Sequence, residues 1–433
     1  MQHVAIITSG MVGITNASFK LVYKLKTEGH KVSYLCPIDI KEKVEKHGID
    51  YIQLPPIHYN FSFLKPKGYV YHLSHLKSQY SNGIKALNFL EYEKILSDLN
   101  PDVVLVDEEL HELIFTSIKL NIPVKLLSQF FSGRMRFNLP PIRTDIIPKK
   151  GLRGSTMGIL KAWLFLKTKI FGRLILNKMT LRGSRRSVLK HYAKQIGFSR
   201  DSLISRNFPS VFIHRDLPIL SMTLPELEFP HSKPKNLSYI GPMVADYNPD
   251  GLEIDADLKR VITSKTADNK QLIYCSITTM AETGDINFIK KVIDAVKQEK
   301  SWKIIISLGG KLEPNTFKNV PNNVHIFKWV PQLYILSKID CSINHGGIHT
   351  IHECIHNKVP MLIYSGKKFD QNGNAARIDF HGLGLMGDKD LDSSERINAK
   401  IKMILSKPSY AHNMESAHQI YKRYDAKEIS SNL

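Results

Sequence analysis

The chain has 433 residues, of which 42% are hydrophobic and 23% charged, so it is long enough for two globular domains of about 200 residues each. No uncharged apolar run reaches the roughly 18 residues that a membrane-spanning helix needs, which excludes such a helix. The formal net charge of +20 leaves nucleic acid, a membrane surface or simple solubility as explanations.

The first half of the chain alternates strand and helix patterns. Apolar runs rich in β-branched residues predict strands at 3–9, 31–36, 102–107 and 122–127. Helical spacing lies between them, at 16–28, at 40–47 and in segments that end near 100 and 120. This order is typical of a parallel sheet with helices on both faces.

The alternation is lost between about 130 and 208, where the charge of the chain is concentrated. Residues 149–200 contain fourteen Lys or Arg and no Asp or Glu. One helical face carries apolar residues: Ile159, Trp163, Leu166, Ile170 and Leu174. Two interpretations stay open, a basic helical excursion packed on its own domain and a segment between Lys149 and Arg200 that binds an anionic membrane surface.

Residues 241–257 are rich in Pro, Gly and acidic residues, so we place the domain boundary there. The pattern then restarts with strands at 271–277 and 302–308 and a helix at 286–299, and further strands are predicted near Val324 and Cys341. We therefore expect a first domain at 1–240, a linker at 241–257, a second domain at 258–408, and a C-terminal helix within 409–433 that returns toward the first domain.

The four cysteines are scattered and contain no C-x-x-C pair, which is typical of a reducing cytoplasm. The N-terminus lacks the basic region and cleavage site of a secretory signal. We expect a cytoplasmic protein, with the basic segment as a possible link to the inner face of the cell membrane.

Three clusters of polar residues lie in the second half of the chain. They read WVPQ at 329–332, NHGGIHTIHE at 344–353 and DQNGNAAR at 370–377. The middle cluster predicts a strand, a glycine turn and a helix whose free N–H groups and dipole can hold a phosphate. Trp329 supplies a surface on which a nucleobase can stack.

This order of clusters resembles the donor-binding signature of the family 1 UDP-glycosyltransferases, in particular the carotenoid glucosyltransferases and macrolide glycosyltransferases. The resemblance implies the GT-B fold, in which two doubly wound Rossmann-like domains face each other and a C-terminal helix crosses between them. It also implies a hexosyltransferase that uses UDP-glucose and needs no metal or other cofactor. The implied donor-binding residues are Trp329, Gln332, His345, Gly346, Gly347, Thr350, Glu353, Asp370, Gln371 and Thr279.

The resemblance assigns these residues different parts of the donor. Trp329 stacks on uracil, Glu353 takes the ribose, and Asp370 with Gln371 takes hexose hydroxyls. His345 and Thr350 hold the diphosphate. Thr279 is expected near the phosphates, although a threonine replaces the glycine that the family has one position earlier.

A competing motif overlaps the second cluster, because His352, Glu353 and His356 spell the H-E-x-x-H of zinc proteases. It names no third ligand and leaves Trp329 and Asp370 without a role. A zinc metalloprotease is therefore only a remote alternative.

The resemblance fails at the general base. Family members carry a histidine in a G-H-x-N-P type sequence before the first helix, whereas this chain has GITNA with Ile14 at that position. Isoleucine cannot move a proton. The partner carboxylate of that histidine matches Asp107, which we expect to act directly as the base, with His111 as a second choice.

Two classes of function follow for the chain. The first is an inverting glycosyltransferase that moves a hexose to a hydroxyl of a lipophilic small molecule. The second is a catalytically impaired nucleotide-sugar-binding protein that serves as a partner subunit. Nucleic-acid binding has only the charge in its favour, since no recognised module is present, and we predict no nucleic-acid partner.

Overall fold

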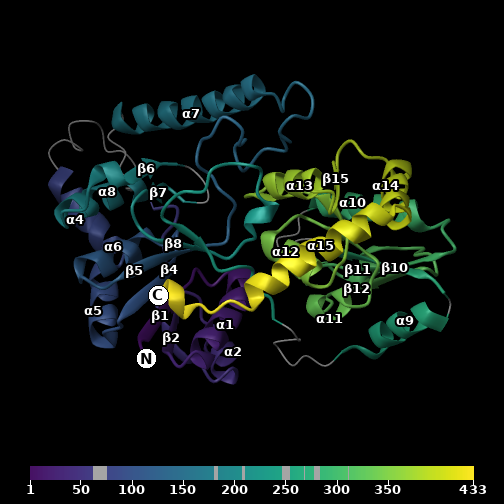
Figure 1. The fold of residues 1–433 in the computed structure, drawn as a ribbon, viewed down its shortest axis with the longest axis horizontal. Coiled ribbons are helices and arrows are strands. Elements are labelled where there is room, and N and C mark those ends of the chain that lie inside the picture. The colour runs from purple at the N-terminus through teal and green to yellow at the C-terminus, as the bar shows by residue number, and fades with distance from the viewer. Residues whose placement is uncertain are drawn as a thin grey trace.

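The computed structural model describes residues 1–61, 76–179, 184–206, 210–245, 254–267, 269–276, 283–310 and 312–433. Two parallel sheets, each flanked by helices, lie side by side and are bridged by the C-terminal helix (Figure 1). The prediction of two facing doubly wound domains with a returning helix is confirmed.

The first sheet has the strand order β3-β2-β1-β4-β5-β8-β9 and is parallel throughout. Its strands are β1 His3–Ile7, β2 Lys31–Cys36, β3 Asp50–Gln53, β4 Val103–Asp107, β5 Val124–Ser128, β8 Ile219–Ser221 and β9 Leu237–Tyr239. The helices of this half are α1 Val12–Thr27, α2 Lys41–Lys46, α4 Leu76–Ala86, α5 Phe89–Leu99, α6 His111–Lys119, α7 Thr156–Met179 and α8 Arg185–Gln195. A hairpin of β6 Leu203–Ser205 and β7 Phe212–His214 lies outside the sheet.

The second sheet has the order β12-β11-β10-β13-β14-β15 and is also parallel. Its strands are β10 Gln271–Ser276, β11 Trp302–Ser307, β12 Val324–Phe327, β13 Cys341–Asn344, β14 Met361–Tyr364 and β15 Gly384–Gly387. The helices are α9 Ala256–Ala267, α10 Thr283–Val296, α11 Gln332–Leu336, α12 Ile348–His356, α13 Gln371–Phe380, α14 Ser394–Ser406 and α15 Pro408–Asp425. The predicted strand, glycine turn and helix of the middle cluster are β13, Gly346–Gly347 and α12.

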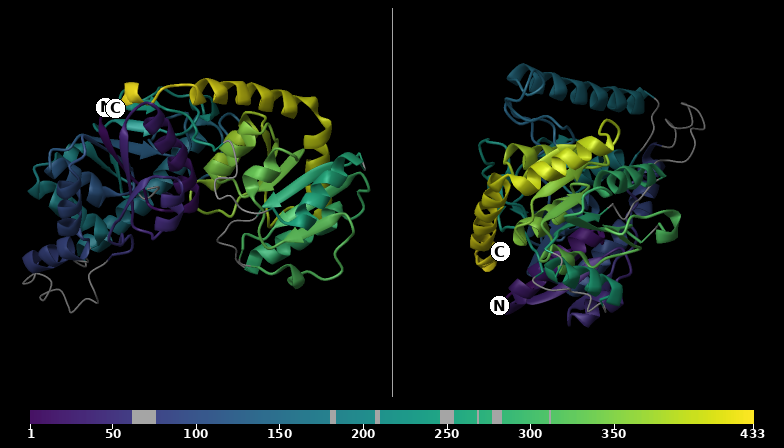
Figure 2. Two further views of the ribbon diagram at one scale, coloured as in Figure 1. Left: turned by 90° about the horizontal axis from the view of Figure 1, so that it is seen from below. Right: turned by 90° about the vertical axis from the view of Figure 1, so that its right-hand side faces the viewer.

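Helix α15 leaves the second domain and returns to the first, where the two termini lie close together (Figure 2). Lys24 Nζ donates to the carbonyl oxygen of Asp425 at 2.5 Å. The carboxylate of Glu28 accepts from the backbone N–H groups of Ile429 and Ser430. These contacts attach the end of the chain to α1.

The two domains also share a hydrophobic core at the interface. Phe131 and Ile142 of the first domain pack in one cluster with Ile348 of α12 and Met414 of α15. Arg377 of α13 is buried there and forms an ion pair with Glu228 of the first domain, with Nε 2.6 Å from Oε1. These apolar contacts and the ion pair therefore join the two domains.

Helix α7 belongs to the basic segment and stands apart from the sheets at one edge of the molecule (Figure 1). Ile159 and Trp163 anchor its beginning, and Trp163 Nε1 donates to the carbonyl oxygen of Leu139 at 2.6 Å. Phe165 and Phe171 are 72% and 65% exposed, so the helix is both packed on its domain and apolar on its outer side. Among the described residues, no helix has the length and apolar character to cross a bilayer.

Candidate active site

Gln332, at the start of α11, joins two residues of α12 into one polar group. Its Nε2 donates to Thr350 Oγ1 at 3.1 Å and to Glu353 Oε2 at 2.5 Å. Thr350 and Glu353 lie on one face of the helix because three residues separate them. Trp329 precedes α11 and is 46% exposed, so its ring offers a free face for stacking.

Burial raises the pKa of Glu353 to about 7, and the hydrogen bond from Gln332 opposes that shift. Ligand hydroxyls that donate to the carboxylate would favour its charged form further. This arrangement fits the predicted contact with ribose hydroxyls.

The glycine turn before α12 is shaped by close contacts. Gly346 has φ of +80°, and a Cβ there would lie 2.8 Å from Ile363 Cγ2. A Cβ on Gly347 would lie 2.8 Å from His345 Nε2, so the absent side chain makes room for the imidazole. Gly347 caps α12 without any side-chain hydrogen bond, which leaves the first-turn N–H groups available to an anion.

His345 is held neutral beside this turn. Burial lowers its pKa to about 4, and the positive charge of Lys389 adds to the effect. Its Nδ1 is buried without a hydrogen-bond partner among the described residues. A neutral imidazole can donate one hydrogen bond to a phosphate and can also take up a proton as charge develops there.

Asp370 and Gln371 lie at the start of α13, directly behind the glycine turn. Asp370 accepts from Asn374 Nδ2 at 2.9 Å, and the same Nδ2 donates to the carbonyl oxygen of Gly346 at 2.9 Å. Gln371 Oε1 accepts from the Gly366 N–H. Both predicted sugar contacts are 5% exposed. Sequence reasoning missed Asn374, which links Asp370 to the glycine turn.

Burial raises the pKa of Asp370 to about 6. The remaining donor-site prediction, Thr279, lies outside the described residues, which skip 277–282. The other predicted donor residues lie in α11, α12 and α13 or in the segments that directly precede these helices.

The first domain contributes the region where a base was expected. Ile14 lies in the first turn of α1, with its side chain buried in the core of the first domain. Asp107 ends β4 and is only 2% exposed; its Oδ2 accepts from the Ser9 N–H at 2.8 Å, while Oδ1 is buried without a partner among the described residues. Burial raises its pKa to about 7.

The expectation for His111 needs correction. Its ring is fully buried, with Nδ1 2.9 Å from His214 Nε2 and Nε2 bonded to Ser210 Oγ. Both nitrogens are therefore engaged inside the first domain, and burial lowers its pKa well below the usual value. In this structure neither nitrogen of His111 is free to accept a proton from a substrate.

The three residues of the H-E-x-x-H motif have different surroundings in the described part of the chain. His352 is 2% exposed, and the ring of His356 packs 5.1 Å from that of Tyr421 on α15. Across the described ranges, no group of three His, Cys, Asp or Glu side chains is placed to hold a metal ion. Glu353 instead faces Gln332.

Comparison with known proteins supports the resemblance to glycosyltransferases. Residues 290–429 match the family model described as the erythromycin biosynthesis protein CIII-like, C-terminal domain. NDP-glycosyltransferase YjiC of Bacillus subtilis (strain 168) is 24% identical over 88% of this chain and 84% of its own length. Zeaxanthin glucosyltransferase of Pantoea ananas is 22% identical over 96% of this chain and 91% of its own length. These matches support a glycosyltransferase of the family 1 type.

The fold of this glycosyltransferase agrees with solved structures. The crystal structure described as the glycotransferase of kitacinnamycin superposes with a TM-score of 0.70, covers 100% of this chain and 97% of its own, and is 16% identical. The GT-B prediction is thus confirmed.

The four cysteines of the glycosyltransferase are free and buried.

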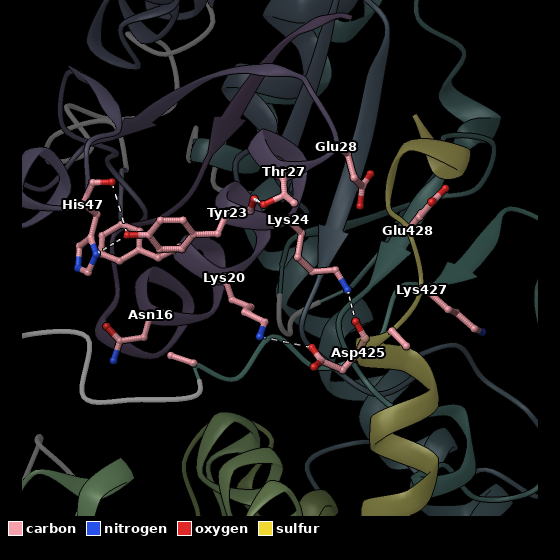
Figure 3. Close-up of a pocket in the computed structure, with 13 residues that line it drawn as sticks. Asn16, Lys20, Tyr23, Lys24, Thr27, Glu28, His47, Asp425, Lys427 and Glu428 are labelled. Atoms are coloured by element: carbon pink, nitrogen blue, oxygen red, sulfur yellow. Dashed lines mark hydrogen bonds and ion pairs between the residues drawn. The ribbon is translucent and has the colours of Figure 1, made fainter.

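A separate cavity of about 410 Å³ lies between α1 and the end of the chain (Figure 3). Lys20 and Lys24 point into it from α1 and contact Asp425. None of the donor-site residues lines it, so this cavity is distinct from the candidate active site of the glycosyltransferase.

Proposed function

We propose that this glycosyltransferase moves a hexose, glucose in the first instance, from a UDP-sugar to a hydroxyl of a lipophilic small molecule, with inversion at the anomeric carbon. The observation that carries the donor assignment is the group formed by Gln332, Thr350 and Glu353 beside the exposed ring of Trp329. It offers stacking to a base and a carboxylate to a ribose, one helical turn from an anion-binding helix start.

The proposed reaction needs no metal ion. The leaving diphosphate would receive hydrogen bonds from the N-terminal turn of α12 and from Thr350, and His345 would stabilise the charge that develops. Together these groups supply the positive potential that a divalent cation supplies in other nucleotide-sugar enzymes. Asp370 and Gln371 remain the proposed hexose contacts, and they would have to release Asn374 and Gly366 when the sugar binds.

The proposal of a lipophilic acceptor rests on two facts. One relative is named for glucosylation of zeaxanthin, an apolar alcohol. Helix α7 carries exposed Phe165 and Phe171 together with the exposed Lys161, Lys167 and Lys169, which is a pattern suited to an anionic bilayer. The proposed location is therefore the cytoplasmic face of the membrane, where such an acceptor would be dissolved.

Calorimetry with UDP, dTDP and UDP-glucose tests the donor, combined with donor hydrolysis and with transfer to alcohols extracted from membranes. We expect UDP to bind more tightly than dTDP, and glucose to appear on an alcohol acceptor. Tight UDP binding without any hydrolysis or transfer would instead support the partner-subunit function that Ile14 suggests. Elemental analysis should give less than one zinc per chain, and zinc removed together with activity would contradict the metal-free site.

A further inference from the structure

His349 is not among the donor-binding residues that the family resemblance implies. It is the second residue of α12, within the turn that is proposed to hold the diphosphate, and its side chain is partly exposed. It reaches across the domain interface, where its Nε2 lies 2.5 Å from Oε1 of Gln129, which follows β5. Oε1 is the side-chain amide oxygen of Gln129 and can only accept a hydrogen bond. Nε2 of His349 therefore carries the proton, and Nδ1 of His349 carries the lone pair.

Nδ1 of His349 has no hydrogen-bond partner among the described residues. The side chain of His349 as a whole is partly exposed, so solvent or a ligand can approach it. The imidazole is thus oriented by one nitrogen and open at the other. A general base needs both of these features.

The ring also lies where the expected base is missing. A Cβ on Gly13 would be 2.7 Å from Cδ2 of His349, so the imidazole edge rests directly on Gly13. Gly13 is the neighbour of Ile14, the position at which the family resemblance places a histidine. The imidazole of His349, from the second domain, therefore lies next to position 14 of the first domain, where the expected histidine is replaced by isoleucine.

We propose that Nδ1 of His349 is the general base that takes the proton of the acceptor hydroxyl, replacing a base at position 14 from the opposite domain. This inference rests on the proposed function, because it places the diphosphate at the start of α12 and the acceptor on the side of the first domain. His349 lies between these two positions.

The step balances without a further reagent. The acceptor oxygen forms a bond to the anomeric carbon while the bond from that carbon to the diphosphate oxygen breaks. The electron pair of the broken bond leaves with the diphosphate, and the hydroxyl proton passes to Nδ1 of His349. Burial lowers the pKa of His349 to about 4, which keeps the ring neutral and able to accept a proton, and the nearby diphosphate would raise that pKa once bound.

The test uses His349→Gln, because the Nε2 of glutamine can still donate to Gln129 while no basic nitrogen remains. We expect transfer to fall by roughly 10² to 10⁴-fold, as for the loss of a general base. The Kd for UDP, measured by calorimetry, should stay within about twofold, so failure of donor binding and failure of the base are separated. His412→Asn, an exposed histidine on α15, is the matched control and should keep full activity.

The double variant Ile14→His with His349→Gln decides between a chemical and a structural role. If His349 is the base, the double variant should transfer sugar at least tenfold faster than His349→Gln alone. Gln129→Ala, which removes only the orienting bond, should lose less activity than His349→Gln. Wild-type turnover in His349→Gln, or equal losses in His349→Gln and Gln129→Ala with no recovery by Ile14→His, would overturn the proposal.

Discussion

The imidazole of His349 packs directly on the backbone of Gly13, one residue from each of the two domains. Gly13 lies within α1 and has no positive φ, so its conformation is open to any residue. What the position requires is the absence of a side chain. This contact makes the spacing between the two domains sensitive to a single methyl group.

Gly13→Ala should therefore destabilise the protein, although alanine favours a helix by up to about 1 kcal/mol over glycine. The added methyl overpacks against His349, which typically costs about 1–3 kcal/mol. Thermal unfolding should show a lower Tm, and transfer should slow because the imidazole is displaced. The double variant with His349→Ala should regain the Tm, whereas a higher Tm in Gly13→Ala alone would mean that the ring moves away at no cost.

Glu353→Ala should weaken UDP binding by about 1–3 kcal/mol, the scale for hydrogen bonds to a charged group. The reason is that the carboxylate of Glu353, which accepts a hydrogen bond from Gln332, is the group proposed to accept from the ribose hydroxyls. His352→Ala is the matched control on the same helix. Its buried ring can cost stability, but calorimetry should show an almost unchanged Kd for UDP. Equal losses from the two variants would contradict the assignment of Glu353.

The fold was largely predictable because its signals are local. Strands β1, β2, β4, β10 and β11 are apolar runs buried on both faces, and their positions agree with the expected ones within about two residues. The short strands β8 and β9 have three residues each and were not predicted. The pairing of β8 with β5 and of β9 with β8 comes from tertiary contact, which a three-residue pattern cannot reveal.

The residues of the candidate site could be predicted from the sequence only where they belong to one recognisable motif. Gln332, Thr350 and Glu353 meet in the structure, and all three belong to the signature formed by the clusters at 329–332 and 344–353. The contact of His349 with Gln129 joins residues 220 positions apart, and no pattern in either segment specifies it. The extra histidine within the HGGIHT stretch was the one available signal.

Arg377→Met should destabilise the protein by about 3–5 kcal/mol, because it leaves the buried carboxylate of Glu228 without its cation. The guanidinium also lies 4.6 Å and 4.5 Å from the ring centroids of Phe131 and Phe229, so packing is lost as well. Urea denaturation measures the change. Adding Glu228→Gln should recover part of the loss, and a single Arg377→Met variant as stable as the wild type would refute the role of this pair at the interface.

Asp107→Asn should change stability in a way that depends on pH. The folded protein raises the pKa of Asp107 from its usual 3.8 to about 7 through burial, so the folded state holds the proton more tightly than the unfolded state. Stability from this group is complete below about pH 4 and is lost as pH rises through 7. Asparagine can still accept from Ser9 and carries no charge, so the variant should have the higher Tm at pH 8 and an equal Tm near pH 4.

The same variant separates two bases. If Asp107 takes the proton directly, as the sequence suggested, Asp107→Asn should lose transfer by roughly 10² to 10⁴-fold while UDP binding persists. If His349 is the base, the loss should be well below that caused by His349→Gln. Initial rates at saturating donor decide between these outcomes.

The last prediction concerns helix α7, whose outer side combines exposed aromatic rings with lysines. The wild type should sediment with anionic phosphatidylglycerol vesicles at low salt, since each Lys or Arg near such a surface contributes about 1 kcal/mol that salt screens. Phe165→Ser with Phe171→Ser should weaken this binding, because both rings would otherwise be buried in the bilayer. Leu391→Ser, which changes a side chain that is 72% exposed in the second domain, should bind like the wild type. A protein that stays in solution with anionic vesicles at low salt would show that the basic segment is only a solvated face, and the proposal of a membrane-dissolved acceptor would lose its physical support.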